Sequence, residues 1–356
     1  MKLSKKIIAL LLLTFLVLAS LTGCGQNAAN GTNAAGTKTA AQTERTVVDM
    51  AGRSVKLPAE IKSIATFGSI GVLNDFVETL GEGSKICNEM SASFTKTDQW
   101  KYQYVFAPQL KTSPLFENAS REIVMEKVLQ TKPDLCLTMT KEQTDQLAAQ
   151  GLNVLYLSWD KTEDVKKCIT LLGEALNKQE VAADYLAYFD KTVAKAQDLT
   201  KNLKEADKKK VVYGSITTYT QPHLIAECWI PTAGGLSMTN NGRTAQTLVY
   251  TLEDLLKWNP DVLILSDKAI KKDVLADSRL SNIPAVKNKQ IFVVPCVAHV
   301  WGNRTTEQPL TILWTMNKLY PNIMTTEALA KEISYFYSHF FKTNLSDAQI
   351  KEIIGS

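Results

Sequence analysis

The segment Gln179–Lys208, with the sequence QEVAADYLAYFDKTVAKAQDLTKNLKEADK, has the strongest helical pattern in the chain. Its apolar residues recur at alternating steps of three and four, which places them on one face of a helix. These residues are Val181, Tyr185, Phe189, Val193, Ala196, Leu199 and Leu203. At 1.5 Å per residue, a helix over the whole segment would be about 40–45 Å long. Such a helix is typical of a coiled-coil dimer or of a rigid connection inside one chain.

The same short phrase stands on each side of this helix. It reads EKVLQTKPD at Glu126–Asp134 and EDLLKWNPD at Glu253–Asp261. Each copy has Glu, then Leu three residues later, then Pro-Asp, and each leads into an apolar run typical of a buried strand. The repetition favours two similar lobes joined by the helix over a coiled coil.

Strand and helix patterns alternate with short links on both sides, which predicts an α/β fold with parallel-rich sheets. We expect two Rossmann-like lobes, one long connecting helix and a ligand cleft between the lobes. A hairpin is expected over Thr46–Pro58. The expected strands are Ile61–Phe67, Asp134–Thr140, Asn153–Leu157, Lys210–Ile216, Leu224–Glu227, Asp261–Ser266 and Gln290–Pro295.

The chain begins with the features of a targeting segment. Lysines precede the apolar run Ile7–Leu18, and Leu-Thr-Gly-Cys follows at residues 21–24. This tetrad is similar to a bacterial lipoprotein cleavage box, which implies lipidation of Cys24; a plain secretory signal or a retained membrane helix is the alternative. We therefore expect a signal peptide at 1–23, a lipid-anchored cysteine and flexible linker at 24–44, an N-terminal lobe at 45–160, a helical segment at 161–208 and a C-terminal lobe at 209–356.

The balance of charged residues argues against a nucleic acid as the binding partner. The chain has 40 basic and 36 acidic residues, and the targeting segment removes three lysines and no acid, so the remainder is nearly neutral. This balance gives no electrostatic case for nucleic acid. Five cysteines follow Cys24; Cys136 and Cys168 lie in apolar patterns that favour buried thiols, and a Cys228–Cys296 disulfide is an open alternative.

Ligands of open α/β sheets bind beyond the carboxyl ends of the strands, and the side chains there are our candidate contacts. The segment 298–304, AHVWGNR, follows a predicted strand and carries three of them, His299, Trp301 and Arg304. Arg304 suits an anionic group unless it pairs with Glu307, Trp301 suits a planar ligand, and His299 suits a metal centre or a hydrogen bond. The further candidates are Trp159, Tyr104, Tyr219 and Trp229. His223, beside Pro222, is interpreted as structural.

The body of the chain resembles the helical-backbone class of ABC-transporter substrate-binding proteins, which carry iron–siderophores, haem and cobalamin. The resemblance rests on the hairpin, the two Glu…Pro-Asp phrases, the long helix and the C-terminal run YFYSHFF…NLSDAQI at 335–350. It implies a lipid-anchored protein on the extracytoplasmic face, monomeric, that docks on an ABC permease and through it on an ATPase. The family's docking carboxylates match Glu126 and Glu253.

The sequence says less about the identity of the ligand than about the class of protein. Three histidines without HxH or HExxH spacing argue against a bare zinc site. Aromatic residues together with Arg304 favour an anionic iron chelate, siderophore or haem, as the ligand over a bare cation. The metal would then arrive as part of the transported ligand, and we expect no cofactor in the protein itself. A corrinoid and a molybdate- or tungstate-type oxyanion are the alternatives. A lipid-anchored α/β enzyme or a scaffold is the rival class, although GxSxG and GxGxxG are both absent from the sequence.

Overall fold

Two parallel β-sheets organise the molecule, whose computed structural model describes residues 45–68 and 70–355. These residues belong to one compact unit. The expected signal peptide 1–23, the linker 24–44 and the lipidation at Cys24 lie outside the described residues. Among the described helices, none has both the length and the apolar character needed to cross a membrane.

The first sheet has the order β3-β4-β5, with strands Ile64–Thr66, Leu135–Thr138 and Val154–Tyr156 in parallel register. Every residue of β3 and β4 is buried, as expected for a parallel sheet covered on both faces. The antiparallel hairpin of β1 (Arg45–Val48) and β2 (Ser54–Leu57) confirms the predicted hairpin. Helices of this lobe are α1 (Ile70–Thr79), α2 (Ala92–Thr95), α3 (Gln103–Phe106), α4 (Met125–Thr131) and α5 (Lys141–Ala148).

The second sheet has the order β11-β10-β6-β8 and is parallel throughout. Its strands are Ile291–Val293, Val262–Leu265, Lys210–Gly214 and Leu236–Ser237. A short antiparallel pair joins β7 (Thr220–Gln221) to β9 (Leu248–Val249). The helices are α8 (Ala226–Thr232), α9 (Leu252–Trp258), α10 (Ile270–Ala276), α11 (Pro284–Lys287), α12 (Gln308–Leu319), α13 (Thr326–His339) and α14 (Asp347–Gly355). Two sheets of this kind confirm the predicted fold class.

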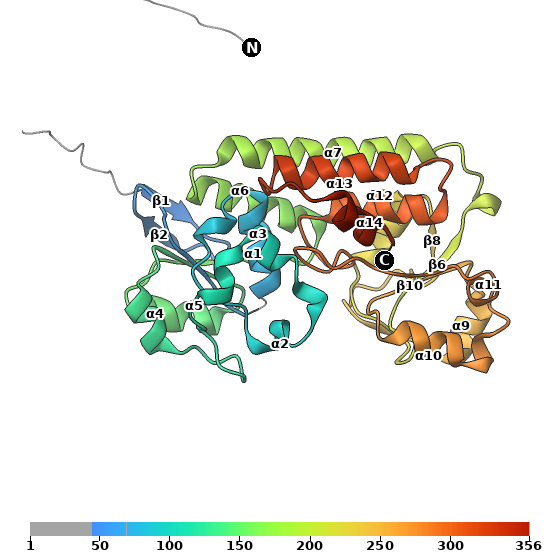
Figure 1. Cartoon of the computed structure of the whole chain (residues 1–356), viewed down its shortest axis with the longest axis horizontal. Helices are drawn as coiled ribbons and strands as arrows, with labels where there is room; N and C mark the ends of the chain where they lie inside the picture. The colour runs from blue at the N-terminus through green and yellow to red at the C-terminus, as the bar shows by residue number, and fades with distance from the viewer. Residues whose placement is uncertain (1–44, 69, 356) are drawn as a thin grey trace, which may run out of the picture. The chain divides into compact units, whose positions relative to one another are not determined.

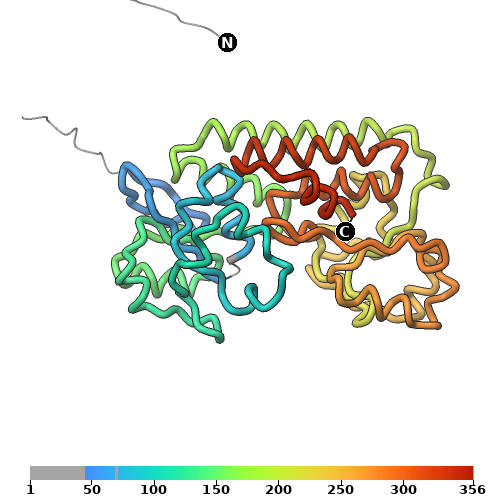
Figure 2. The backbone as a smooth tube through the Cα atoms, viewed as in Figure 1, coloured from blue at the N-terminus to red at the C-terminus, as the bar shows by residue number. Residues whose placement is uncertain are grey.

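The connecting helix α7 spans Gln179–Thr200 and lies along both lobes (Figures 1 and 2). It packs against α6 (Thr162–Ala175) of the first lobe and against α12 of the second. The hydroxyl of Tyr185 donates to the carbonyl oxygen of Thr306 at 2.8 Å, and Tyr188 packs on Phe336 of α13. The apolar face of α7 is therefore covered within this chain, which is the role of an internal strut.

The predicted helix was too long at its C-terminal end. Helix α7 stops at Thr200, eight residues before Lys208, so its length is about 33 Å. Leu203 lies beside Gly234 instead of continuing the helical stripe, and Leu199 is 38% exposed. Tertiary packing of Leu203 thus overrides the local periodicity that predicted the longer helix.

The two repeated phrases have the same structure. Helices α4 and α9 each have seven residues and each end at a residue in the left-handed conformation, Lys132 with φ 51° and Asn259 with φ 46°. A proline follows in both copies and prevents the helix from continuing. Glu126 and Glu253 lie exposed in the first turns of their helices.

The aspartate that closes each phrase explains why Pro-Asp recurs. The carboxylate of Asp134 accepts the backbone N–H of Lys62 at 2.8 Å, just before β3. The carboxylate of Asp261 accepts the backbone N–H of Lys210 at 2.9 Å, at the first residue of β6. Each aspartate therefore satisfies a backbone donor of the neighbouring strand, in equivalent places in the two lobes.

Two further expectations from the sequence are settled by the structure. The predicted strand Leu224–Glu227 is wrong, because the chain there enters helix α8, which buries Trp229 and Ile230. Cys136 and Cys168 are buried thiols as predicted, and Cys228 and Cys296 are free rather than paired.

Candidate functional site

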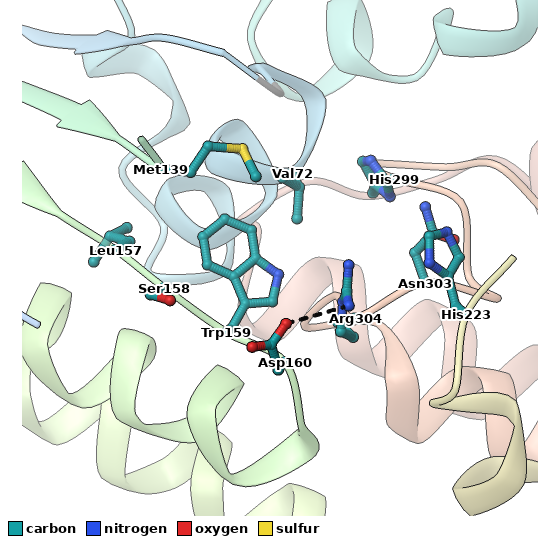
Figure 3. Close-up of a pocket in the computed structure, with 10 residues that line it drawn as sticks. All are labelled: Val72, Met139, Leu157, Ser158, Trp159, Asp160, His223, His299, Asn303 and Arg304. Atoms are coloured by element: carbon teal, nitrogen blue, oxygen red, sulfur yellow. Dashed lines mark ion pairs between the residues drawn. The ribbon is translucent and has the colours of Figure 1, made fainter. Parts of the chain in front are cut away.

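A cavity of about 310 Å³ lies where the carboxyl ends of strands from both sheets meet (Figure 3). The first lobe contributes the residues that follow β4 and β5, together with one residue of α1. The second lobe contributes the residue that follows β7 and the segment between β11 and α12. The lining residues are Val72, Met139, Leu157, Ser158, Trp159, Asp160, His223, His299, Asn303 and Arg304.

Arg304 is the cationic residue of this cavity. Its Nη1 lies 3.7 Å from Oδ1 of Asp160, its one ion-pair partner among the described residues. Its Nε is buried without a hydrogen-bond partner in the described part of the chain. Burial lowers the pKa of Arg304, and the charge of Asp160 opposes this shift. An arginine has a pKa so high that Arg304 still carries its positive charge at neutral pH.

The alternative pairing of Arg304 with Glu307 does not occur. The carboxylate of Glu307 accepts the backbone N–H groups of Ala298 at 3.0 Å and His299 at 2.8 Å. It therefore holds the backbone of the cavity segment, and it leaves Arg304 directed at the cavity.

The same segment is held from two more sides. The side-chain amide of Gln103 in α3 donates to the carbonyl oxygen of Ala298 at 2.7 Å. Gly302 packs so closely on Tyr213 of β6 that a Cβ atom at position 302 would lie 2.2 Å from the tyrosine hydroxyl oxygen. A rigid segment places His299 and Arg304 at fixed positions, as a preformed binding site requires.

Both histidines of the cavity are neutral at pH 7. Burial lowers the pKa of His299 to about 3; the nearby His223 and Arg304 lower it further, and a hydrogen bond with the backbone of Val300 opposes the shift. Burial, followed by the charge of Arg304, lowers the pKa of His223 to about 4. The imidazoles therefore offer hydrogen-bonding or metal-coordinating nitrogens without adding charge.

Aromatic rings support this arrangement. The indole of Trp159 lies beside Asp160 in Figure 3 and packs edge-on against Phe76 of α1, with ring centroids 5.0 Å apart. The ring of His299 meets Trp100 edge-on, also at 5.0 Å. Each of these cavity side chains is thus backed by a ring of the first lobe.

The structure brings together three of the seven predicted ligand contacts, Trp159, His299 and Arg304. The other four lie elsewhere, each with another neighbour. Trp301 and Trp229 are fully buried in the apolar core.

The remaining two predicted contacts are tyrosines outside the cavity lining. Tyr219 packs on Tyr250, and the hydroxyl of Tyr104 donates to the carboxylate of Glu89 at 3.0 Å.

Four polar lining residues were not among the predicted ligand contacts: Ser158, Asp160, His223 and Asn303. Asp160 and Asn303 are sequence neighbours of predicted contacts, so a wider window at each strand end would have included them. His223 was interpreted as structural because it stands beside Pro222, whereas it lies just after the end of β7 and lines the cavity.

A second, larger cavity of about 830 Å³ lies between residues 97–102, the ends of β10 and β11, and α14. Its charged lining residues are Lys101, Lys268, Lys271, Asp98, Asp267 and Glu352. Lys101 pairs with Glu352 at 2.5 Å, and the acidic and basic residues balance. None of these six side chains has a buried polar atom without a hydrogen-bond partner, in contrast to Nε of Arg304.

A bare metal ion has no ready cage in the part of the chain that the structure describes. No group of three or more His, Cys, Asp or Glu side chains is placed there to hold one.

Residues 89–298 match the family model described as periplasmic binding protein, and this match covers more than half of the chain. The chain belongs to that family. As a member of that family, it is an extracytoplasmic, non-enzymatic binding protein.

Solved structures show the same fold. A periplasmic solute-binding protein from Veillonella parvula has 24% identity and a TM-score of 0.75, over 87% of this chain and 97% of that one. MolA of Haemophilus influenzae, with molybdate bound, has 19% identity and a TM-score of 0.72, over 85% and 99%. CeuE of Helicobacter pylori, with Ni(II) bound, has 18% identity and a TM-score of 0.65, over 87% and 99%.

One stretch has higher identity to a curated protein. It is 32% identical over 97 residues to the molybdate-binding protein MolA of Haemophilus influenzae. This stretch spans 26% of the present chain and 28% of MolA.

Proposed function

We propose that this protein captures a compact anionic solute, of the oxyanion class that includes molybdate and tungstate, and delivers it to an ABC permease. The observation that carries the proposal is Arg304, which lines an interlobe cavity with a buried Nε that no described residue satisfies. An unpartnered buried donor on a charged group is costly, and an anion in the cavity would remove that cost.

The size of the cavity favours a small anion. Its volume of about 310 Å³ lies at the lower end of the roughly 300–1,000 Å³ that is typical of small-molecule pockets. A tetrahedral oxyanion with a few waters fills such a space. A tetrapyrrole or corrinoid ring needs the lobes to separate further, so haem and cobalamin rank lower.

We expect the solute to bind by replacing the carboxylate of Asp160 at the guanidinium of Arg304. The carboxylate of Asp160 holds Arg304 loosely at 3.7 Å, which is beyond hydrogen-bonding distance. An incoming oxyanion takes its place on the guanidinium, with neutral His223, His299 and the amide of Asn303 available as hydrogen-bonding neighbours. Similarity to a molybdate-binding protein, in fold and in one stretch of sequence, supports this ligand class.

An anionic iron chelate such as a ferric siderophore, the ligand that the sequence argument favoured, is the second candidate. Trp159 supplies an aromatic wall, and the two neutral imidazoles can complete the coordination of a metal that its chelator leaves open. The related fold of CeuE with Ni(II) bound is consistent with such a solute.

Delivery to the permease is proposed to use Glu126 and Glu253. They are exposed at equivalent places in the two lobes, and α7 holds the lobes at a fixed separation. A partner with two equivalent basic receptors would match this pair. Lipidation at Cys24 would anchor the protein as a monomer at the outer face of the membrane, next to the permease and its ATPase.

A ligand panel tests the proposal. The protein is mixed with molybdate, tungstate, sulfate, a ferric catecholate chelate, haem or cobalamin, and its unfolding is followed by calorimetry. The true ligand class stabilises the fold by about 2.7 kcal/mol at a hundredfold excess over Kd. Stabilisation by molybdate and tungstate supports the first candidate; stabilisation by the ferric chelate alone replaces it with the second.

A further inference from the structure

Three carboxyl groups are buried together where α1 of the first lobe meets the cavity segment of the second. Asp75 and Glu78 project from α1, and Glu307 precedes α12; each is at most 1% exposed. No Lys, Arg or His forms an ion pair with any of the three within residues 45–68 and 70–355. Buried carboxylates without cations are so unfavourable that such groups take up protons instead.

The hydrogen bonds around Asp75 show where one proton lies. Thr79 Oγ1 lies 2.8 Å from the carbonyl oxygen of Asp75 and 2.6 Å from Thr306 Oγ1. A carbonyl oxygen only accepts, so the single hydroxyl hydrogen of Thr79 goes to it. Thr306 must then donate its own hydroxyl hydrogen to Thr79.

The last of these linked contacts, between Thr306 and Asp75, then requires a hydrogen from Asp75. Thr306 Oγ1 lies 2.6 Å from Asp75 Oδ1, and its only hydrogen is already used. The other oxygen, Asp75 Oδ2, accepts the backbone N–H of Thr306 at 2.9 Å, as the carbonyl oxygen of a protonated carboxyl should. Reversing the hydroxyls would leave Thr79 Oγ1 and the Asp75 carbonyl as two acceptors 2.8 Å apart without a hydrogen.

Glu307 has the opposite environment. Its oxygens accept the backbone N–H groups of Ala298 and His299 and the hydroxyl of Tyr337. Burial raises the pKa of Glu307 to about 7, and these three donors oppose that shift by stabilising the ionised carboxylate. The negative charge of the cluster therefore belongs on Glu307, and a second charge on nearby Asp75 would be repelled by it.

We propose that Asp75 carries a proton in the folded protein, and that this proton fastens α1 to the segment that shapes the ligand cavity. Asp75 is bonded to Thr306, and the adjacent Glu307 holds the backbone at Ala298 and His299. Asp75 is thus a positioning residue for a cavity that it does not line.

Every titratable group that faces Asp75 favours this protonation. Glu78 lies on the same helix, Glu307 on the cavity segment, Tyr185 on α7 and Tyr337 on α13. None of them supplies a positive charge. Burial and the charge of Glu307 raise the pKa of Asp75 well above its ordinary value, against the opposing hydrogen bond from the backbone N–H of Thr306.

The proton on Asp75 makes the stability of the folded protein depend on pH in a predictable way. The unfolded chain releases it near the ordinary aspartate pKa of about 4, whereas the folded chain keeps it to higher pH. Between these limits the folded state binds one more proton, so Asp75 makes the unfolding equilibrium constant rise tenfold per pH unit as the pH increases. The variant Asp75→Asn keeps the hydrogen bonds, because its amide donates to Thr306 Oγ1, and it has no proton to lose.

The test compares denaturant unfolding of the wild type and Asp75→Asn from pH 5 to 8 without ligand, so its outcome is independent of the proposed function. As the pH rises from 5, the ratio of their unfolding constants should change by up to tenfold per pH unit until the folded wild type releases the proton, with the variant gaining stability relative to the wild type. The exposed Asp145→Asn in α5 is the matched control and should run parallel to the wild type. A pH-independent ratio for Asp75→Asn would overturn the proposal.

A second variant keeps the proposal testable if Asp75→Asn does not fold. In Thr79→Val the hydroxyl of Thr306 is free to donate to Asp75, so an ionised carboxylate is better tolerated. The infrared spectrum of the wild type at pH 7 should then contain a protonated-carboxyl C=O band that is weakened in Thr79→Val. Identical bands in the two proteins would show that Asp75 does not hold this proton.

Discussion

The guanidinium of Arg304 lies 3.7 Å from the carboxylate of Asp160, and this ion pair joins the two lobes across the cavity (Figure 3). Asp160 follows β5 of the first lobe and Arg304 precedes α12 of the second. The side chain of Asp160 is 72% exposed and that of Arg304 is 21% exposed. The carboxylate can therefore turn to solvent when another anion enters, whereas the guanidinium stays at the cavity.

The variant Asp160→Asn removes the carboxylate that competes with the ligand. An exposed ion pair contributes about 0.2–1 kcal/mol, so the affinity for an oxyanion should increase by about 1.4- to fivefold. Isothermal titration calorimetry measures the change, with Asp145→Asn as the control distant from the cavity. A lower affinity in Asp160→Asn would mean that Asp160 itself contacts the solute.

The double variant Glu126→Ala, Glu253→Ala should abolish most solute uptake by intact cells and leave ligand affinity unchanged. Both carboxylates are exposed and neither lines the cavity, so only docking should suffer. The control Glu180→Ala removes an exposed acid from the first turn of α7, where the helix-dipole contribution is similar. Normal uptake by the double variant would show that the permease is contacted elsewhere.

The buried histidines should destabilise the protein in acid. The pKa values of His223 and His299 are lowered to about 4 and about 3, so between these values and about 6.5 the unfolded chain binds protons that the folded chain refuses. Stability is then lost as pH falls below about 6.5, at about 1.4 kcal/mol per pH unit for each histidine.

The variant His223→Gln isolates one of these contributions. Between pH 6.5 and 4.5 its free energy of unfolding should fall less steeply than that of the wild type. The difference in slope should be about 1.4 kcal/mol per pH unit, which is the contribution of one histidine. Denaturant titrations at several pH values measure this, and His339→Gln, on a partly exposed ring paired with Asp184, is the comparison. Parallel curves for His223→Gln and the wild type would contradict a neutral His223.

Close packing of α6 on α7 gives a test of the strut. A Cβ atom at Gly173 would lie 2.6 Å from the Cβ of Ala182, so Gly173→Ala forces the two helices apart. Overpacking of this kind costs about 1–3 kcal/mol. The control Gly355→Ala, where a Cβ meets no atom within 4 Å, should leave the free energy of unfolding nearly unchanged. Equal stability of both variants would show that α6 and α7 can shift without cost.

Local patterns predicted the lobes because the decisive signals are short-range. Pro133 and Pro260 end their helices, the aspartate after each begins a strand, and the fully buried runs around β4 and β10 indicate parallel sheets. The end of α7 was not predictable in this way, because Leu203 packs against Gly234, which lies more than thirty residues further along the chain.

The cavity was only partly predictable for a related reason. The strand-end rule placed the segment 298–304 at the predicted ligand cleft, and His299 and Arg304 line the cavity. Trp301 lies between them in sequence yet is fully buried in the core. In an irregular segment no periodicity tells which side chains face inward, so the sequence could not separate Trp301 from its neighbours.

The central claim is that Arg304 holds the anionic solute. Isothermal titration of molybdate into the wild type, Arg304→Gln and the distant control Arg279→Gln tests it most directly. Loss of a buried charged donor costs about 2–5 kcal/mol, so affinity should fall by about thirtyfold or more in Arg304→Gln and stay unchanged in Arg279→Gln. Molybdate binding of equal affinity in all three proteins would contradict the account.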